Sequence, residues 1–223
     1  MNKPKAVILL SGGLDSFVSL AAAQNNYDIK LALTFDYGQR AADDEIKASK
    51  KICEIYNIEH KVIKLPFLGN ISNSALNNND ENLEFDNLGI NSMKAVWVPN
   101  RNGLFLNIAA CFCDALGFQY IIFGANKEEA GTFSDNSKEF CATADEFLKY
   151  STLNGVKVLA PLIDLEKFEI INLAIKLNVD LSLLKSCYNS TGKGRHCGVC
   201  ESCKRLKNAI LKSSNKDLIK LFF

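Results

Sequence analysis

The chain has 223 residues and a mass of 24.7 kDa, with 48% hydrophobic and 23% charged side chains. This balance is ordinary for a globular enzyme and excludes a disordered, collagen-like or coiled-coil chain. The 26 basic and 25 acidic side chains leave a formal net charge of +1, which argues against a protein whose whole surface grips nucleic acid.

Short apolar segments alternate with stretches of helical periodicity along the chain. Gly, Pro, Asn or Asp bound the apolar segments, and we predict strands at residues 6–10, 30–35, 61–65, 120–123 and 156–159. Helices are predicted at 17–25, 41–56, 102–116 and 165–177, with another after residue 204. This alternation predicts an α/β fold, in which helices cover both faces of a parallel sheet.

Residues 69–92 interrupt the alternation, with eight asparagines in 24 residues and only scattered apolar side chains. A long irregular stretch inside a compact domain is usually functional. We predict a lid over the active site here. The alternative is a surface insertion without a function.

A glycine-rich turn at residues 10–16 joins the first predicted strand to the first predicted helix. Such a turn points unpaired backbone N–H groups toward an anion at the positive end of the helix dipole. The pattern resembles the SGGxDS loop of ATP pyrophosphatases. That resemblance implies that ATP binds through Leu10, Ser11, Gly12, Gly13, Leu14, Asp15 and Ser16. Asp15 is suited to a phosphate-bound Mg²⁺. The alternative is a plain helix cap, for which Asp15 and Ser16 would also serve.

Four cysteines cluster near the end of the chain with the spacing Cys187-x9-Cys197-x2-Cys200-x2-Cys203. Zinc takes four tetrahedral thiolates, and a Cys-x-x-Cys turn supplies adjacent corners, so we predict one structural Zn²⁺ on these residues. A [4Fe–4S] cluster is the competing interpretation, although the fourth cysteine does not follow the ferredoxin spacing. His196 is a substitute ligand candidate. The remaining cysteines, Cys53, Cys111, Cys113 and Cys141, fall in apolar helical patterns and are predicted to be buried.

The motifs taken together resemble one family. SGGLDS at 11–16, FDYGQR at 35–40, VPNRN at 98–102, GAN at 124–126 and the cysteine segment at 186–203 occur in the order seen in 7-cyano-7-deazaguanine synthases of the PP-loop ATP pyrophosphatase superfamily. The resemblance spans essentially the whole chain. It implies a PP-loop domain at 1–184 that binds ATP and adenylates the substrate, with a Rossmann-like fold similar to that of adenine-nucleotide α-hydrolases, and a zinc-binding segment with a C-terminal helix at 185–223.

The resemblance also implies the reaction. ATP adenylates the carboxylate of 7-carboxy-7-deazaguanine, ammonia displaces AMP to give an amide, and a second ATP activates the amide oxygen so that loss of AMP leaves the nitrile. An acyl adenylate hydrolyses readily, so the site must exclude water. The nitrile is an intermediate of queuosine biosynthesis.

Residue roles follow from the same resemblance. The implied catalytic residues are Asp15, Ser16, Arg101 and Asp135, and Asp36 and Tyr37 join the loop in binding ATP. The implied substrate-binding residues are Gln39, Arg40, Arg101, Asn102, Gly124, Asn126, Phe133 and Asp135. Plainer interpretations are a surface arginine at 101 and a core aromatic at 37. Asp135 and Glu128 are candidates for accepting the ammonium proton.

The chain departs from the family pattern at residues 129–137, where many members have a stretch close to DYSGYPDCR. Asp135 keeps its place, Phe133 replaces a tyrosine, and Ser137 stands where the arginine would be. The departure removes a cation from a substrate-facing loop. We consider Lys127 or Lys138 as a replacement for the lost charge.

Two other function classes fit parts of the sequence. A PP-loop tRNA-thiolating enzyme could share the loop and the cysteines, and residues 185–223 carry a net charge of +7 that could bind RNA phosphates. A non-catalytic ATP-binding zinc adaptor would bind ATP without releasing AMP.

The expected partners are the small-molecule substrates alone, with no direct nucleic acid, and the sequence leaves a homodimer open. No apolar run approaches the roughly 18–20 residues of a membrane span, and the apolar stretch at 6–10 is too short for a signal peptide. We therefore expect a cytoplasmic protein with no membrane partner.

Overall fold

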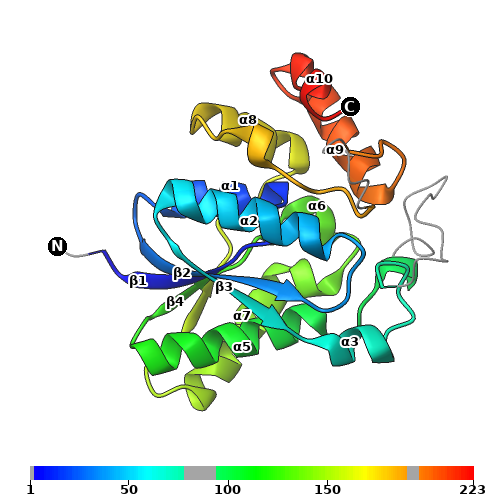
Figure 1. The fold of residues 1–223 in the computed structure, drawn as a ribbon. Coiled ribbons are helices and arrows are strands. Elements are labelled where there is room, and N and C mark those ends of the chain that lie inside the picture. The colour runs from blue at the N-terminus through cyan, green and yellow to red at the C-terminus, as the bar shows by residue number, and fades with distance from the viewer. Residues whose placement is uncertain (1–2, 78–93, 190–195) are drawn as a thin grey trace.

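The computed structural model describes residues 3–77, 94–189 and 196–223 (Figure 1). Five parallel strands form one sheet in the order β3-β2-β1-β4-β5. They are β1 (Lys5–Leu9), β2 (Asp28–Asp36), β3 (Glu59–Lys64), β4 (Tyr120–Ile122) and β5 (Lys157–Leu159). The parallel α/β architecture predicted from the alternating pattern is confirmed.

Helices cover both faces of this sheet (Figure 1). One face carries α1 (Leu14–Ala23), α2 (Ala42–Tyr56), α8 (Lys167–Lys176) and α9 (Glu201–Lys212). The other carries α5 (Arg101–Leu116) and α7 (Lys138–Ser151). Short helices α3 (Pro66–Ile71), α6 (Lys127–Ala130) and α10 (Ile219–Phe222) connect or end these elements, and 3₁₀ turns lie at Ser134–Asn136, Leu181–Leu183 and Lys216–Leu218.

The alternation of side chains along β1 explains the two layers. Ala6 and Ile8 are fully buried in the core on the α1 side, while Val7 and Leu9 are buried in the core on the α5 side. Because successive side chains of a strand point to opposite faces, a strand apolar at every position must be covered twice. Buried residues of α9 extend the first core, so the C-terminal segment packs onto the same layer.

The strand order reverses between β1 and β4, and parallel sheets bind ligands outside the strand ends at such a point. Gly124 follows β4 there and lies against the start of α1. A Cβ on Gly124 would approach the backbone N of Ser16 to 3.0 Å, so a larger residue would push the two segments apart. The close approach brings the glycine-rich turn at residues 10–16, which we call the phosphate loop, beside the end of β4.

Each predicted strand and helix has a counterpart, with bounds that shift by a few residues. The main difference is α1, which begins at Leu14 rather than at 17, because the glycine turn is tighter than its composition suggests. Helix α7 was not predicted as an element, since Leu148 is its one buried residue. Cys53 and Cys113 are buried as predicted and Cys141 is half-buried, but the prediction for Cys111 is wrong because its position on α5 faces solvent.

Part of the predicted lid is described. Residues 69–71 belong to α3. In the turn that follows, the carbonyl of Leu76 accepts from the backbone N–H of Arg40 at 2.8 Å, and the N–H of Ala75 donates to the carbonyl of Ala95 at 2.7 Å. Residues 78–92 lie outside the described part of the chain, so the lid stays a prediction. The domain division at 184/185 also stays a prediction. None of the helices in the described segments combines the length and apolar character that a membrane span requires.

Candidate active site and metal centre

A pocket of about 240 Å³ opens at the carboxyl ends of the strands. The phosphate loop, the end of β2 and the start of α5 line it together with Gly124, Lys167, Lys185, Ser186 and Tyr188. These segments are far apart in the sequence and meet because their strands end at one edge of the sheet. The pocket therefore lies where the glycine-rich turn was predicted to bind an anion.

Two serines hold the phosphate loop in shape. The Oγ of Ser16 accepts from the backbone N–H of Ser11 at 3.2 Å and donates to the carbonyl of Gly13 at 3.2 Å. The Oγ of Ser11 accepts from the backbone N–H of Gly13 at 3.3 Å. Gly13 caps α1 without a side-chain hydrogen bond, so first-turn N–H groups remain for a ligand.

Gly12 has a positive φ of 73° and packs against α2. A Cβ at this position would lie 2.7 Å from the Cβ of Ala48, which leaves no room for a side chain. The Gly12 carbonyl accepts a hydrogen bond from the backbone N–H of Lys185 at 2.8 Å. The loop is thus fixed between α2 and the segment that leads to the cysteines.

A buried lysine joins two carboxylates beside the loop. The Nζ of Lys167 lies 2.7 Å from Oδ2 of Asp15 and 2.6 Å from Oε1 of Glu129. Lys167 is 8% exposed, and the other carboxylate oxygen of Asp15 is buried without a hydrogen-bond partner among the described residues. An unsatisfied buried carboxylate oxygen next to a phosphate loop is suited to a cation that arrives with the ligand.

The pKa shifts of the cluster keep Lys167 charged. Burial would lower the pKa of Lys167, but Asp15 and Glu129 outweigh it and raise this pKa above its ordinary value. Burial acts to raise the pKa of Glu129, yet Lys167 outweighs it and holds this pKa below the usual range. Burial raises the pKa of Asp15, with Lys167 opposing the rise. Lys167 is therefore charged, and the carboxylates beside it offset that charge within the cluster.

Arg101 begins α5 and faces the end of β2. Its Nη1 donates to the hydroxyl of Tyr37 at 3.1 Å, and its guanidinium lies 5.7 Å from the centroid of that ring. Asn102 Nδ2 donates to the carbonyl of Asp135 at 3.3 Å. Burial raises the pKa of the Asp135 carboxyl, while Arg101 opposes the rise. Arg101 and Asp135 thus belong to one polar group.

Aromatic rings line the opposite part of the pocket. The rings of Phe35 and Phe105 stack with centroids 3.9 Å apart and planes 5° from parallel, and Tyr37 adjoins Phe105 at 5.8 Å. Trp97 and Phe133 form a second near-parallel pair at 6.4 Å. A flat ring system can stack on a free face of such rings, and charged residues of the phosphate loop line the same pocket.

Glu45 of α2 is a buried carboxyl in the pocket wall that sequence reasoning did not single out. It accepts a hydrogen bond from Gln39 Nε2 at 2.8 Å, and Gln39 in turn receives the backbone N–H of Tyr37 on its Oε1 at 2.9 Å. Burial raises the pKa of Glu45 to about 7. Gln39 is therefore held in place by backbone and carboxyl partners.

Most of the predicted site residues meet in this pocket. Those that line it are Leu10, Ser11, Gly13, Leu14, Asp15, Ser16, Tyr37, Gln39, Arg40, Arg101, Asn102, Gly124, Phe133 and Asp135. Gly12, Asp36 and Asn126 do not line it. Gly12 packs on α2, Asp36 accepts from the backbone N–H of Gly38 at 3.2 Å, and Asn126 caps α6. These three act on the backbone around the pocket.

Neither Lys127 nor Lys138, which we considered as replacements for the lost charge, lines the pocket. Both lysines are exposed, and they pair with Glu166 and Asp164 outside the pocket. Ser137, which stands in the arginine's place, caps α7 by accepting from the backbone N–H of Phe140 at 3.0 Å. Lys167 is the lysine that enters the pocket from that side. Glu128, the other proton-acceptor candidate, lies 3.5 Å from Arg205 instead of in the pocket.

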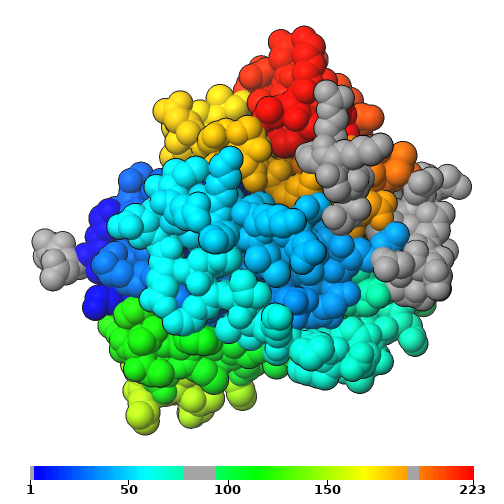
Figure 2. Space-filling view, in the orientation of Figure 1, coloured from blue at the N-terminus to red at the C-terminus, as the bar shows by residue number. Residues whose placement is uncertain are grey.

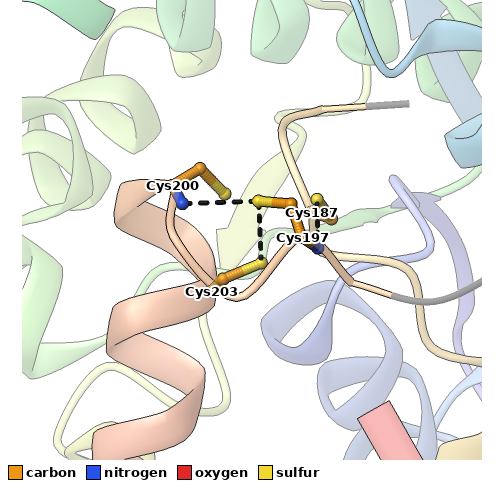
Figure 3. Close-up of side chains that lie close together, drawn as sticks. All are labelled: Cys187, Cys197, Cys200 and Cys203. Carbon is orange, nitrogen blue, oxygen red and sulfur yellow. Dashed lines mark hydrogen bonds between the residues drawn. The ribbon is translucent and has the colours of Figure 1, made fainter. Parts of the chain in front are cut away.

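The four clustered cysteines converge as their spacing predicted (Figure 3). Their Sγ atoms all lie within 4.8 Å of one another, and those of Cys197 and Cys203 are 3.8 Å apart. Thiolates about 2.3 Å from one central ion lie about 3.8 Å from each other along the edges of a tetrahedron. The four residues therefore fit a single metal ion.

The backbone supports this cluster as it does in metal-thiolate sites. The N–H of Cys197 donates to the sulfur of Cys187 at 3.3 Å, and the N–H of Cys200 donates to that of Cys197 at 3.4 Å. His196 points away from the cluster, because its Nε2 accepts from the backbone N–H of Ser186 at 3.2 Å. His196 is thus a neighbour of the site and not a ligand in this arrangement.

The sequence of the chain matches one family of known proteins over nearly its whole length. A family model described as "Queuosine biosynthesis protein QueC" matches residues 5–214. The 7-cyano-7-deazaguanine synthase of Methanosarcina barkeri is 47% identical over 224 residues, which cover 96% of each chain. That of Carboxydothermus hydrogenoformans is 51% identical over 211 residues, covering 92% of this chain and 97% of the relative.

Solved structures agree on the fold. The U34-tRNA thiolase NcsA of Methanococcus maripaludis, solved with its [4Fe–4S] cluster, has a TM-score of 0.51 at 20% identity and matches 99% of this chain and 68% of the thiolase. The NMN synthetase of Francisella tularensis also has a TM-score of 0.51, at 17% identity, over 99% of this chain and 82% of its own. At these identities the likeness concerns the fold alone.

Proposed function

The chain belongs to the family of queuosine biosynthesis protein QueC, and from this membership we propose that it is an ATP-dependent ligase that makes 7-cyano-7-deazaguanine. The proposed substrates are 7-carboxy-7-deazaguanine, ammonia and ATP. One observation carries most of the proposal: Lys167, held by two carboxylates, lies beside a phosphate loop at the mouth of an aromatic pocket. That arrangement suits a reaction in which pyrophosphate leaves the α-phosphate of ATP beside a bound flat base.

The first step makes the substrate carboxylate reactive. A carboxylate oxygen attacks the α-phosphorus of ATP, and pyrophosphate leaves with the bonding electron pair. Negative charge grows on the leaving pyrophosphate, and cations already in place stabilise it without reorganisation. Lys167 and Arg101 supply that charge from this chain, and the N–H groups at the start of α1 bind the phosphate oxygens.

The second step forms the carbon–nitrogen bond. Ammonia attacks the acyl carbon, AMP leaves, and the nitrogen gives up a proton to a base. Asp135 is our proposal for that base, because its carboxyl lines the pocket and burial raises its pKa toward that of a useful acceptor. The same site then activates the amide oxygen with a second ATP, and loss of AMP leaves the nitrile.

The remaining residues are proposed to bind and orient the substrates. Asp15 and Ser16 serve the phosphates, and when Mg²⁺ arrives with ATP the buried free oxygen of Asp15 is its proposed ligand. Tyr37, Gln39, Arg40 and Asn102 form the wall against which the base lies, with Phe133 on the other side. Asp36, Gly124 and Asn126 hold the backbone of that wall.

We propose that Zn²⁺ occupies the cysteine site and has a structural role. The 3.8 Å separation of the sulfurs of Cys197 and Cys203 suits one tetrahedral ion. The cysteines of a [4Fe–4S] cluster bind four different irons and lie further apart. An ion there would order a segment that contains little apolar core of its own.

The test is turnover by the purified protein with ATP, Mg²⁺, ammonium and 7-carboxy-7-deazaguanine, followed by mass spectrometry of the base. A nitrile product together with AMP supports the proposal. AMP release that needs tRNA and a sulfur donor would replace it with thiolation, and ATP binding without AMP release under either condition would replace it with an adaptor. A cytoplasmic location, a homodimer and the lack of a nucleic acid partner stay predictions.

A further inference from the structure

Residues 185–188 connect the two sites of the molecule, and we call this segment the strap. Lys185, Ser186 and Tyr188 line the pocket, while Cys187 between them belongs to the cysteine cluster. On the other side of the cluster, Ser202 lies between two of the cysteines and also faces the pocket. One wall of the pocket is thus built from the residues that would enclose the metal.

The strap also holds the phosphate loop directly. The backbone N–H of Lys185 donates to the carbonyl of Gly12 at 2.8 Å, and the Lys185 carbonyl would lie 3.9 Å from a Cβ on Gly13. Gly12 also packs so closely on α2 that a Cβ there would lie 2.7 Å from that of Ala48, so the loop has no room to shift toward α2. The strap therefore sets where the loop's N–H groups point.

Hydrogen bonds tie the strap to the rest of the cysteine segment. The N–H of Ser186 donates to Nε2 of His196, and the sulfur of Cys187 accepts from the N–H of Cys197. His196 packs edge-on against the rings of Phe222 and Phe223. These contacts are weak compared with four metal–thiolate bonds, so the position of the strap depends on the metal.

Two polar groups of the strap face the pocket and are suited to binding a ligand. The Oγ of Ser186 is buried and has no hydrogen-bond partner among the described residues, although it lines the pocket. The side chain of Lys185 is 10% exposed, and its Nζ lies 3.7 Å from Oδ2 of Asp44. A hydroxyl without a partner and a buried amine at the edge of a phosphate loop are donors that phosphate oxygens would use.

We propose that the strap couples the two sites, so that metal in the cysteine cluster and ATP on the phosphate loop each strengthen the binding of the other. Lys185 is then a positioning residue for the loop. The inference rests on the proposed binding of ATP, but it does not depend on the reaction. Coupling of this kind is reciprocal, because each ligand must change the affinity of the other by the same factor.

The experiment measures the binding of MgATP in the absence of 7-carboxy-7-deazaguanine and ammonia. It compares the full chain stripped of metal with the same chain reloaded with Zn²⁺. Trp97 is the single tryptophan and lines the pocket, so its fluorescence reports the binding. We expect the reloaded protein to bind MgATP about tenfold more tightly, a typical size for such coupling. Zinc affinity, measured by competition with a chelator in excess Mg²⁺, should rise by the same factor when ATP is present.

Two variants at Lys185 separate the backbone contact from the side chain. K185P removes the N–H that donates to Gly12, and the extended ψ of 137° at Leu184 suits a following proline. K185A keeps the N–H. We expect K185A to retain the coupling and K185P to lose it while still binding zinc.

Either of two results would overturn the inference. Equal affinity for MgATP with and without zinc in the wild type would do so, even if the nitrile is formed. Undiminished coupling in K185P would show that the strap is not the connection. Coupling without nitrile formation would leave this inference intact and contradict the proposed function instead.

Discussion

The Nζ of Lys167 lies 2.7 Å from Oδ2 of Asp15, although the two residues are 152 positions apart in the chain. Asp15 lies in the first turn of α1 beside the phosphate loop, and Lys167 is the first residue of α8, which packs next to α1. Their pairing places the ammonium group of Lys167, shared with the carboxylate of Glu129, next to the phosphate loop. Figure 2 shows residues near 167 and the C-terminal segment packed together on one face of the molecule.

Replacing Asp15 by asparagine should nearly abolish ATP-dependent turnover and leave the fold intact. Asparagine has the same size but lacks the charge that Mg²⁺ requires, while Lys167 keeps its contact with Glu129. AMP release and a circular dichroism spectrum measure the two effects. Normal AMP production by D15N would contradict the role of Asp15.

Lys167→Met should lower kcat by a factor of about 10²–10³, as removal of a donor that stabilises developing charge does in other enzymes. Zinc content should not change. Lys127→Met is the matched control, because Lys127 is an exposed lysine of the same region that pairs with Glu166 outside the pocket. Thermal melting shows whether each variant is folded. A folded K167M with the rate of the control would refute the assignment.

Glu45 makes the stability of the protein depend on pH. Its pKa is raised by burial from 4.5 to about 7, so the folded state holds a proton that the unfolded state releases, and stability falls as the pH rises from about 4.5 to 7. Glu45→Gln removes the cost of burying an ionised carboxylate, and the new amide oxygen can still accept the hydrogen bond from Gln39. We expect E45Q to gain about 1–3 kcal/mol over the wild type at pH 8 and little at pH 4.5.

Urea unfolding of both proteins at the two pH values measures this difference. Comparing them at the same pH cancels the effect of acid on the cysteines, which both proteins share. If E45Q and the wild type differ in stability by the same amount at pH 4.5 and at pH 8, Glu45 is not a buried carboxyl with a raised pKa.

Cys200→Ser should lose the metal and loosen the C-terminal segment. Cys200 is fully buried, and its sulfur is one of four that lie within 4.8 Å of one another. Cys111→Ser is the control, because that thiol is exposed on α5 and belongs to no cluster among the described residues. Elemental analysis and limited proteolysis provide the measurements. Unchanged metal content in C200S would rule out the site.

Local patterns account for what the sequence predicted well. The strands are short apolar runs with clear ends, and the phosphate loop is a contiguous motif between β1 and α1. The cysteine site follows from the Cys-x-x-Cys spacing of three of the thiols, which places neighbouring sulfurs on adjacent turns of one short segment. Each of these features depends on residues close together in the sequence.

Contacts between distant segments account for what was missed. Nothing near Lys167 in the sequence indicates that it meets Asp15 and Glu129, since a lysine at the start of a helix is usually solvated. The replacement charge was sought in Lys127 and Lys138, which are closer along the chain but exposed. Glu45 resembles any acidic residue in the first turn of a helix, and only the packing of α2 against the pocket buries it.

The central claim is that this pocket activates the same base twice with ATP. The most direct measurement supplies 7-carboxy-7-deazaguanine, MgATP and ¹⁵N-labelled ammonium, and then counts AMP and weighs the base by mass spectrometry. The account predicts a nitrile that carries one ¹⁵N, with two AMP released per base. A base without label, or no AMP released in the presence of this acid, would contradict it.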